Sequence, residues 1–324
     1  MNHISKEARI YIAGHKGLIG SAFHRYFEKN NYANLIVADR KDLDLKNQNQ
    51  TRSFFRDQKI DYVIFAAGKV GGIVENRDKP AEFIMENLSM QVNAFRYASK
   101  YNVKKFIFFA SSCVYPKYSD SPMSENIIGS AIPEQTSIGY STAKYAGIQM
   151  SLALNKQSNK VIFIPVIPNS VYGPNDNFNP LSSHVIAALI RKFHEAKINK
   201  LPQVEIWGTG LPKREFVYVD DLVEGIIKIL STNLENDFLP INIAPQKDLS
   251  IKSLAELISR VIGYDGKIVN DTSKPDGSPR KILDNSRISS LGWKANVSLE
   301  KGILITYNWF LENQRFFITE PEKK

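Results

Sequence analysis

Tyr140 and Lys144 have the spacing Y-x-x-x-K at the start of a predicted helix. Residues i and i+4 share one face of a helix, so the phenol and the ammonium would lie together. A phenol with a pKa of about 10 exchanges protons poorly at neutral pH, and a neighbouring ammonium would lower that pKa. Ser111 follows a predicted buried strand, which would place its hydroxyl at the carboxyl end of a sheet. Together, Ser111 and Tyr140 could polarise a substrate carbonyl for hydride attack.

A glycine-rich turn, Gly14–Gly20, follows the first predicted strand and opens a helix with the spacing G-x-x-G-x-x-G. Glycines permit a tight turn and let backbone N–H groups approach a pyrophosphate, so the turn predicts a dinucleotide site. An acidic residue after the second strand would bind the ribose of NAD, whereas a basic residue would accommodate the 2′-phosphate of NADP. The sequence has Asp39 and Arg40 there. Arg40 with Lys16 favours NADPH, and we expect Asp39 to face away or to pair with Arg40.

Short apolar runs alternate with helix-period segments in the first half of the chain. The runs are rich in β-branched and aromatic residues and apolar on both faces, as in buried parallel strands. They are Arg9–Ala13, Leu35–Ala38, Tyr62–Ala67, Phe106–Ala110 and Val161–Val166. Helices are predicted between them over about 18–30, 48–58, 80–102 and 138–157. This alternation predicts right-handed βαβ units in a doubly wound parallel sheet, an α/β fold.

The pattern loosens after about Asn169. Further helices are predicted over about 184–196, 220–231, 251–263 and 298–312, and strands at Val204–Trp207 and Phe216–Val219. Leu239–Ile243 is expected to be a buried strand that returns to the first sheet. We therefore expect a smaller C-terminal α/β domain, with a cleft between it and the first.

The amino-acid composition argues against several classes of protein. The 324 residues are 43% hydrophobic and 23% charged, which argues against disorder. The longest apolar run, Val161–Pro168, is far shorter than the roughly 20 residues that cross a bilayer. Lys and Arg number 42 against 33 Asp and Glu, a net charge of +9, but they are scattered. This balance suits anionic small molecules or a lysine-rich surface better than nucleic acid.

The remaining sequence signals concern location and metals. Met1–Ala8 has no apolar segment, so we expect no secretion signal. The single cysteine, Cys113, allows no internal disulfide and suits a reducing cytoplasm. No histidines, cysteines or acidic residues cluster at metal-ligand spacing, so we expect no metal.

The glycine turn, the strand-end serine and Y-x-x-x-K, in this order, resemble the extended short-chain dehydrogenase/reductase family. Further motifs resemble its members that act as 3,5-epimerases and 4-reductases on GDP-4-keto-6-deoxy-mannose. These motifs are Lys69–Ile73, Ser111–Pro116, Asp176–Phe178, Ser183–Ile186, Trp207–Gly210, Arg214–Phe216 and Lys274–Gly277. The resemblance implies an NADP-binding Rossmann domain over 1–168, a mainly GDP-sugar-binding domain over 169–324, and a homodimer formed through helices 80–102 and 138–157.

The resemblance also implies roles for individual residues. Ser111, Tyr140 and Lys144 would be the reductase triad, and Cys113 and His184 the epimerisation pair. The implied cofactor contacts are Gly14, His15, Lys16, Gly17, Leu18, Ile19, Gly20, Arg40, Ala110, Ser111, Ser112, Tyr140, Lys144, Pro168, Asn169, Val171 and His184. The implied GDP-sugar contacts are Lys192, Trp207, Arg214 and Asp276, where Lys192 stands at a position that can carry another basic residue in the family.

The residue types of Cys113 and His184 agree with this assignment. Inverting a carbon beside a ketone needs a base on one face of the sugar ring and an acid on the other. A thiol with a pKa of about 8.5 and an imidazole with a pKa of about 6.5 suit that task after modest shifts. The enediolate would carry its charge on the oxygen that Tyr140 and Ser111 hold, so one site would serve both reactions. The alternative for a lone cysteine is packing in the core.

Other functions remain open at this point. One is a C4 reductase with partial or no epimerase activity on a related GDP-4-keto sugar, such as a heptose or a dideoxy sugar. A second is a sugar-nucleotide 4-epimerase that keeps NAD bound, against which Arg40 and Lys16 argue. A third is a non-catalytic nucleotide-binding scaffold, which we would expect to have lost Tyr140 or Lys144.

Overall fold

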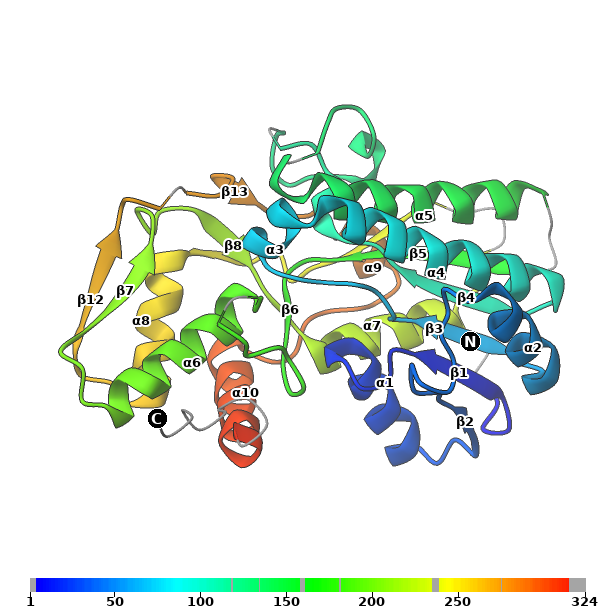
Figure 1. The fold of residues 1–324 in the computed structure, drawn as a ribbon, viewed down its shortest axis with the longest axis horizontal. Coiled ribbons are helices and arrows are strands. Elements are labelled where there is room, and N and C mark those ends of the chain that lie inside the picture. The colour runs from blue at the N-terminus through cyan, green and yellow to red at the C-terminus, as the bar shows by residue number, and fades with distance from the viewer. Residues whose placement is uncertain are drawn as a thin grey trace.

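A central parallel sheet and the helices that cover its two faces form what we call the first lobe. The computed structural model describes residues 4–117, 119–133, 135–157, 161–180, 182–234, 239–274 and 276–314. Within these ranges the sheet has six strands in the order β10-β5-β4-β3-β1-β2 (Figure 1), and every pair of neighbours is parallel. The strands are β1 (Arg9–Ala13), β2 (Asn34–Ile36), β3 (Tyr62–Phe65), β4 (Lys105–Phe109), β5 (Ile162–Pro168) and β10 (Ile241–Ile243).

Helices cover both faces of this sheet (Figure 1). On one face lie α1 (Leu18–Lys29) and α7 (Val219–Ser231), and on the other lie α2 (Gln48–Gln58), α4 (Pro80–Lys100) and α5 (Ile138–Gln157). Side chains alternate along each strand, so Ile12 joins the core under α1 and α7 while Tyr11 joins the core under α4 and α5. Because both faces are covered, the strands are apolar throughout.

The second lobe packs three helices around its own core. The helices are α6 (Val185–Ile198), α8 (Ile251–Ile262) and α10 (Leu299–Asn313). Short strands surround them: β6 (Val171–Tyr172) with β9 (Val217–Tyr218), β7 (Gln203–Trp207) with β12 (Lys267–Asp271), and β8 (Lys213–Glu215) between β11 (Asp248–Ser250) and β13 (Arg280–Lys281). Serines cap two of the helices, since Ser250 and Ser298 accept backbone N–H bonds at the starts of α8 and α10.

The chain passes between the lobes at several points. It leaves the sheet after β5, returns through β9 into α7, and leaves again from β10 to β11. It returns once more after β13, where α9 (Ser286–Ser290) packs on the core beneath α7. β10 lies within the stretch where the sequence predicts a returning strand, and it adds to the outer edge of β5.

The α/β fold with its parallel sheet is as the sequence predicts, with local differences. β2 ends at Ile36 rather than Ala38, at the edge of the sheet, and Val219 begins α7 instead of ending a strand. α3 (Ile73–Asp78) and the short strands β6, β8, β11 and β13 carry no apolar period, so sequence patterns miss them, whereas β9 lies within the predicted strand Phe216–Val219. In the part of the chain that the structure describes, no helix has the length and apolar character that a membrane span requires.

Candidate active site

The glycine turn has the geometry of a phosphate-binding loop. Gly14 has a φ of 80°, and a Cβ added there would lie 2.9 Å from the backbone nitrogen of Ala67. At Gly20 an added Cβ would lie 2.1 Å from the Gly14 carbonyl oxygen. Gly17 precedes α1 and has no side chain to cap it. The first N–H groups of the helix are therefore available to an anion, and the turn fits a pyrophosphate.

The two cations expected near the cofactor both have carboxylate partners. Lys16 Nζ lies 2.6 Å from Asp39 Oδ1, and Arg40 Nη2 lies 3.7 Å from Glu86 Oε2 on α4. The expectation that Asp39 would face away or pair with Arg40 is therefore wrong, because the Asp39 carboxylate pairs with Lys16 of the glycine turn. The Lys16 hydrogen bond holds the pKa of Asp39 below its usual value. Lys16 and Arg40 remain 72% and 75% exposed, so both stay accessible to a ligand.

Ser111, Cys113 and Tyr140 lie together at the carboxyl end of β4. Ser111 begins a short 3₁₀ turn, Ser112–Val114, and its Oγ accepts a hydrogen bond from the Cys113 N–H at 3.3 Å. Ser111 also shares a hydrogen bond with the Tyr140 phenol at the start of α5. Cys113 is close enough to affect the pKa of that phenol, and its side chain is half-buried. The strand end thus brings a hydroxyl, a thiol and a phenol to one place.

Lys144 supports this group from within the protein. It is only 4% exposed, and its Nζ donates to the Phe109 carbonyl oxygen at 2.7 Å and lies 5.6 Å from the centre of the Tyr140 ring. Burial lowers the pKa of Lys144 to about 8. The expected lowering of the Tyr140 pKa is not found, because burial of the phenol raises that pKa and outweighs the Ser111 hydrogen bond. Tyr140 is therefore neutral at pH 7 and can donate a proton.

His184 lies in the second lobe. It is the residue before α6, and its side chain is exposed. Surrounding protein atoms still desolvate the imidazole and lower its pKa, which favours the neutral form at pH 7. Among the described residues, no hydrogen bond or ion pair joins His184 to Cys113. The epimerisation pair thus stays a prediction.

The four predicted GDP-sugar contacts lie around β7 and its neighbours. Trp207 ends β7 and is 55% exposed. The next turn is held by Asp276, which accepts hydrogen bonds from the Thr209 N–H at 2.9 Å and the Thr209 hydroxyl at 2.7 Å. Arg214 on β8 donates to the Ser278 carbonyl oxygen at 2.7 Å. Lys192 on α6 donates to the Glu205 carbonyl oxygen on β7 at 2.6 Å.

The other predicted residues lie at strand and helix ends. Leu18 and Ile19 begin α1, Ala110 and Ser112 follow β4, and Val171 begins β6. The motif Lys274–Gly277 includes Pro275, which lies outside the described residues.

The sequence analysis assigned no role to two buried polar residues near these elements. The Asn87 side chain on α4 accepts a hydrogen bond from the Lys69 N–H and donates one to the Lys69 carbonyl oxygen, both at 3.0 Å. It thereby fixes the loop after β3, where a Cβ added at Gly68 would lie 3.7 Å from Lys144 Nζ. The second is Glu215, a buried carboxylate on β8. A polar residue at an apolar helix or strand position is the signal that could have identified both.

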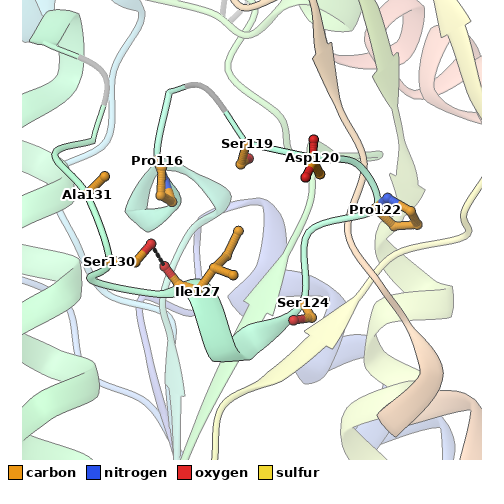
Figure 2. A pocket seen from close by; sticks show the side chains of 8 residues that line it. All are labelled: Pro116, Ser119, Asp120, Pro122, Ser124, Ile127, Ser130 and Ala131. Atoms are coloured by element: carbon orange, nitrogen blue, oxygen red, sulfur yellow. Dashed lines mark hydrogen bonds between the residues drawn. The ribbon is translucent and has the colours of Figure 1, made fainter.

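A surface pocket of about 330 Å³ lies in the loop that connects the 3₁₀ turn of Cys113 to α5 (Figure 2). Its lining residues are Pro116, Ser119, Asp120, Pro122, Ser124, Ile127, Ser130 and Ala131. None of them is a predicted site residue, and the Ser130 hydroxyl donates to the Ile127 carbonyl oxygen of the same loop (Figure 2). The pocket is therefore separate from the cluster at Tyr140.

Comparisons with known proteins agree with this geometry. Residues 10–244 match the model described as the NAD dependent epimerase/dehydratase family. The chain is 44% identical to GDP-L-fucose synthase 1 of Arabidopsis thaliana, over 95% of this chain and 94% of the relative. It is 42% identical to GDP-L-fucose synthase of Escherichia coli K12, over 95% and 98%. GDP-mannoheptose C4 reductase MlghC from Campylobacter jejuni with NADP bound has a TM-score of 0.87 and 34% identity, over 95% and 99%.

The parallel sheet, the glycine turn and the Ser–Tyr–Lys group define an oxidoreductase of the extended short-chain dehydrogenase/reductase class. Within that class, this chain belongs to the NAD dependent epimerase/dehydratase family.

Proposed function

We propose that this protein converts a GDP-4-keto-6-deoxy-mannose-type sugar to GDP-L-fucose, by epimerising C3 and C5 and then reducing C4 with NADPH. The observation that carries this proposal is the cluster of Ser111, Cys113 and Tyr140 at the end of β4. The cluster combines carbonyl-binding donors with a thiol acid or base. Relatives that are 42–44% identical over nearly the whole chain are GDP-L-fucose synthases.

The epimerisation uses the acidity of the carbons beside the C4 ketone. Tyr140 and Ser111 donate hydrogen bonds to O4, and one of Cys113 and His184 removes the proton from C3 or C5. The electron pair of the broken C–H bond moves into an enediolate whose negative charge lies on O4. The other member of the pair returns a proton to the opposite face of the carbon. The half-buried thiol beside the phenol fits this role.

Reduction follows in the same site. NADPH supplies a hydride when it is bound. Tyr140 then gives its proton to O4, which suits a phenol that burial keeps neutral. Lys144 lies within reach to stabilise the phenolate that remains. Reduction removes the ketone on which the C–H acidity depends, so it fixes the new stereochemistry.

The residues around the glycine turn fit the cofactor. Gly14–Gly20 would hold the pyrophosphate. The turn needs glycine at position 20, because a side chain there would clash with the Gly14 carbonyl oxygen. Lys16 and Arg40 would bind the 2′-phosphate in competition with Asp39 and Glu86. The solved structure of MlghC contains NADP.

For the GDP-sugar we propose the surface around β7. Lys192 on α6 and Arg214 on β8 would neutralise the diphosphate, since both are cations. Trp207 would stack on the nucleotide or the sugar, and Asp276 would complete the contact from the turn that it holds. This arrangement supports a nucleotide-binding domain over 1–168, with β10 in its sheet, and a mainly GDP-sugar-binding domain over 169–324.

We further propose a cytoplasmic homodimer that binds neither nucleic acid nor membrane. α4 and α5 lie side by side over the sheet (Figure 1), and Met85 on the outer face of α4 is 67% exposed. Val92, two turns further along α4, is also exposed. Apolar side chains on the outer face of a helix suit an interface between two copies.

One experiment distinguishes this function from C4 reduction alone. The purified protein is incubated with GDP-4-keto-6-deoxy-mannose and NADPH in D₂O, and NMR locates the label. Deuterium at C3 and C5 together with NADPH oxidation is expected. The heptose C4 reductase among the structural relatives supports C4 reduction alone as the alternative function. Reduced product without deuterium at either carbon would replace the proposal with that alternative.

A further inference from the structure

Glu215 is a buried carboxylate at the place where the chain passes between the lobes. Its Oε1 accepts hydrogen bonds from the Asn169 side-chain amide at 2.8 Å and from the Leu283 N–H at 2.7 Å. Its Oε2 accepts from the Gln246 N–H at 3.0 Å. The donors belong to the end of β5, to the segment after β13 and to the connection from β10 to β11. One side chain therefore joins three crossing segments to β8.

Two neighbours of Glu215 are residues that we propose to contact the two ligands. Arg214, a proposed GDP-sugar contact, precedes it on β8, and successive side chains of a strand point to opposite faces. Asn169 belongs to the stretch Pro168–Val171 that we propose to contact the cofactor. The Asn169 amide also donates to the Lys281 carbonyl oxygen at 3.1 Å, whereas its own carbonyl oxygen is buried without a partner. The amide donor bonds alone therefore orient the Asn169 side chain.

The three donors favour the ionised form of Glu215. An ionised carboxylate only accepts hydrogen bonds, whereas a protonated one also carries an O–H group that needs an acceptor of its own. Burial raises the pKa of Glu215 to about 7, although the three hydrogen bonds oppose that shift. The charged groups that face it are Asp248, opposite it on β11, and Arg280 on β13, which pair with each other at 2.8 Å. Below pH 7 the network should therefore loosen.

We propose that Glu215 is a positioning residue that holds the Asn169 stretch and Arg214 in the relative placement that GDP-sugar binding requires. This inference rests on the proposed function. Glu215 touches no reacting atom and acts through Arg214 and Asn169. Its ionised form binds the sugar nucleotide tightly, and its protonated form binds it weakly.

The test measures binding of GDP-L-fucose, the proposed product, to the full-length protein by calorimetry. In Glu215→Gln an amide N–H group replaces one acceptor, so Kd should rise by about tenfold or more. In the unaltered protein Kd should rise as the pH falls from about 8 to about 6, since Glu215 takes up its proton there. The variant should lose this dependence, which loss of stability alone would not cause.

Asp221→Asn is the matched control. Asp221 on α7 is also buried and accepts the backbone N–H groups of Asn296 and Val297 at 3.1 and 3.0 Å. Its loss should lower the melting temperature and leave the Kd of GDP-L-fucose unchanged. Equal weakening of binding in both variants would mean that Glu215 is only structural.

The remaining outcomes separate the two proposals. If the unaltered protein does not bind GDP-L-fucose, the proposed function fails. If it binds with the same Kd from about pH 6 to about pH 8, or if Glu215→Gln binds equally well, the positioning role is wrong. If Glu215→Gln does not fold, Asn169→Ala removes one bond to the carboxylate and should weaken GDP-L-fucose binding; unchanged affinity would overturn the role.

Discussion

Replacing Tyr140 with phenylalanine removes one hydroxyl from the centre of the site. Two effects follow, and they differ between the two reactions. Both reactions lose one of two hydrogen bonds to O4, which costs about 10²- to 10³-fold. Reduction also loses its proton donor, because the half-buried, neutral phenol is the group that we propose gives a proton to O4. That second loss is worth about 10²- to 10⁴-fold, or about 3–5 kcal/mol.

The ratio of the two rates is the quantity to measure. Deuterium uptake at C3 and C5 is followed by NMR, and NADPH oxidation by absorbance, in the same preparation. Uptake should stay measurable, because Ser111 still donates to O4, while the ratio of uptake to oxidation rises about 10²-fold or more. Tyr145→Phe is the control: Tyr145 is on the same helix as Tyr140, and its hydroxyl lies beside Gly129. If Tyr140→Phe slowed both reactions by the same factor, the phenol would not be the proton donor.

Three further predictions concern the same site. Cys113→Ala should stop deuterium uptake at C3 and C5 while ketone reduction survives; uptake at the parent rate would exclude the thiol as acid or base. Burial lowers the pKa of Lys144 to about 8, so kcat/KM for reduction should decline as the pH rises through about 8 and the ammonium is lost; a rate profile with no inflection between about 7 and 9 would contradict this. Gly20→Ala should abolish NADPH binding in a fluorescence titration, because the added Cβ would lie 2.1 Å from the Gly14 carbonyl oxygen; near-normal affinity would show that the turn can relax.

Much of the first lobe could be predicted from the sequence. The helices at 48–58 and 138–157 have the bounds that periodicity predicts, and β1 begins and ends where its apolar run does. Strands buried on both faces leave a continuous apolar signal. β8 and β13 leave none: they are two or three residues long and begin with Lys213 and Arg280. Such strands form because distant segments meet, which no local pattern records.

The candidate site, too, could be predicted from the sequence only in part. A serine after a buried strand and Y-x-x-x-K at a helix start correctly placed Ser111 and Tyr140 together. The predicted direction of the Tyr140 pKa shift was wrong, because burial of the phenol and the nearby Cys113 raise the pKa and outweigh the Ser111 hydrogen bond. The partner of Asp39 was also wrong, since Lys16 reaches it from another turn. Which neighbour pairs with a charged side chain, and which neighbour shifts a pKa most, can be seen only in the three-dimensional structure.

The position of β10 has a consequence for how the chain acquires its structure. Residues 4–168 contain every other strand of the central sheet, but β5 keeps an unpaired edge until residues 241–243 have been synthesised. That edge includes the apolar residues Ile164 and Val166, so a fragment ending near Pro168 would expose a strand that invites pairing with other copies. During translation the central sheet therefore cannot be completed until more than seventy further residues have been synthesised, and a nascent chain stalled in that interval would tend to aggregate.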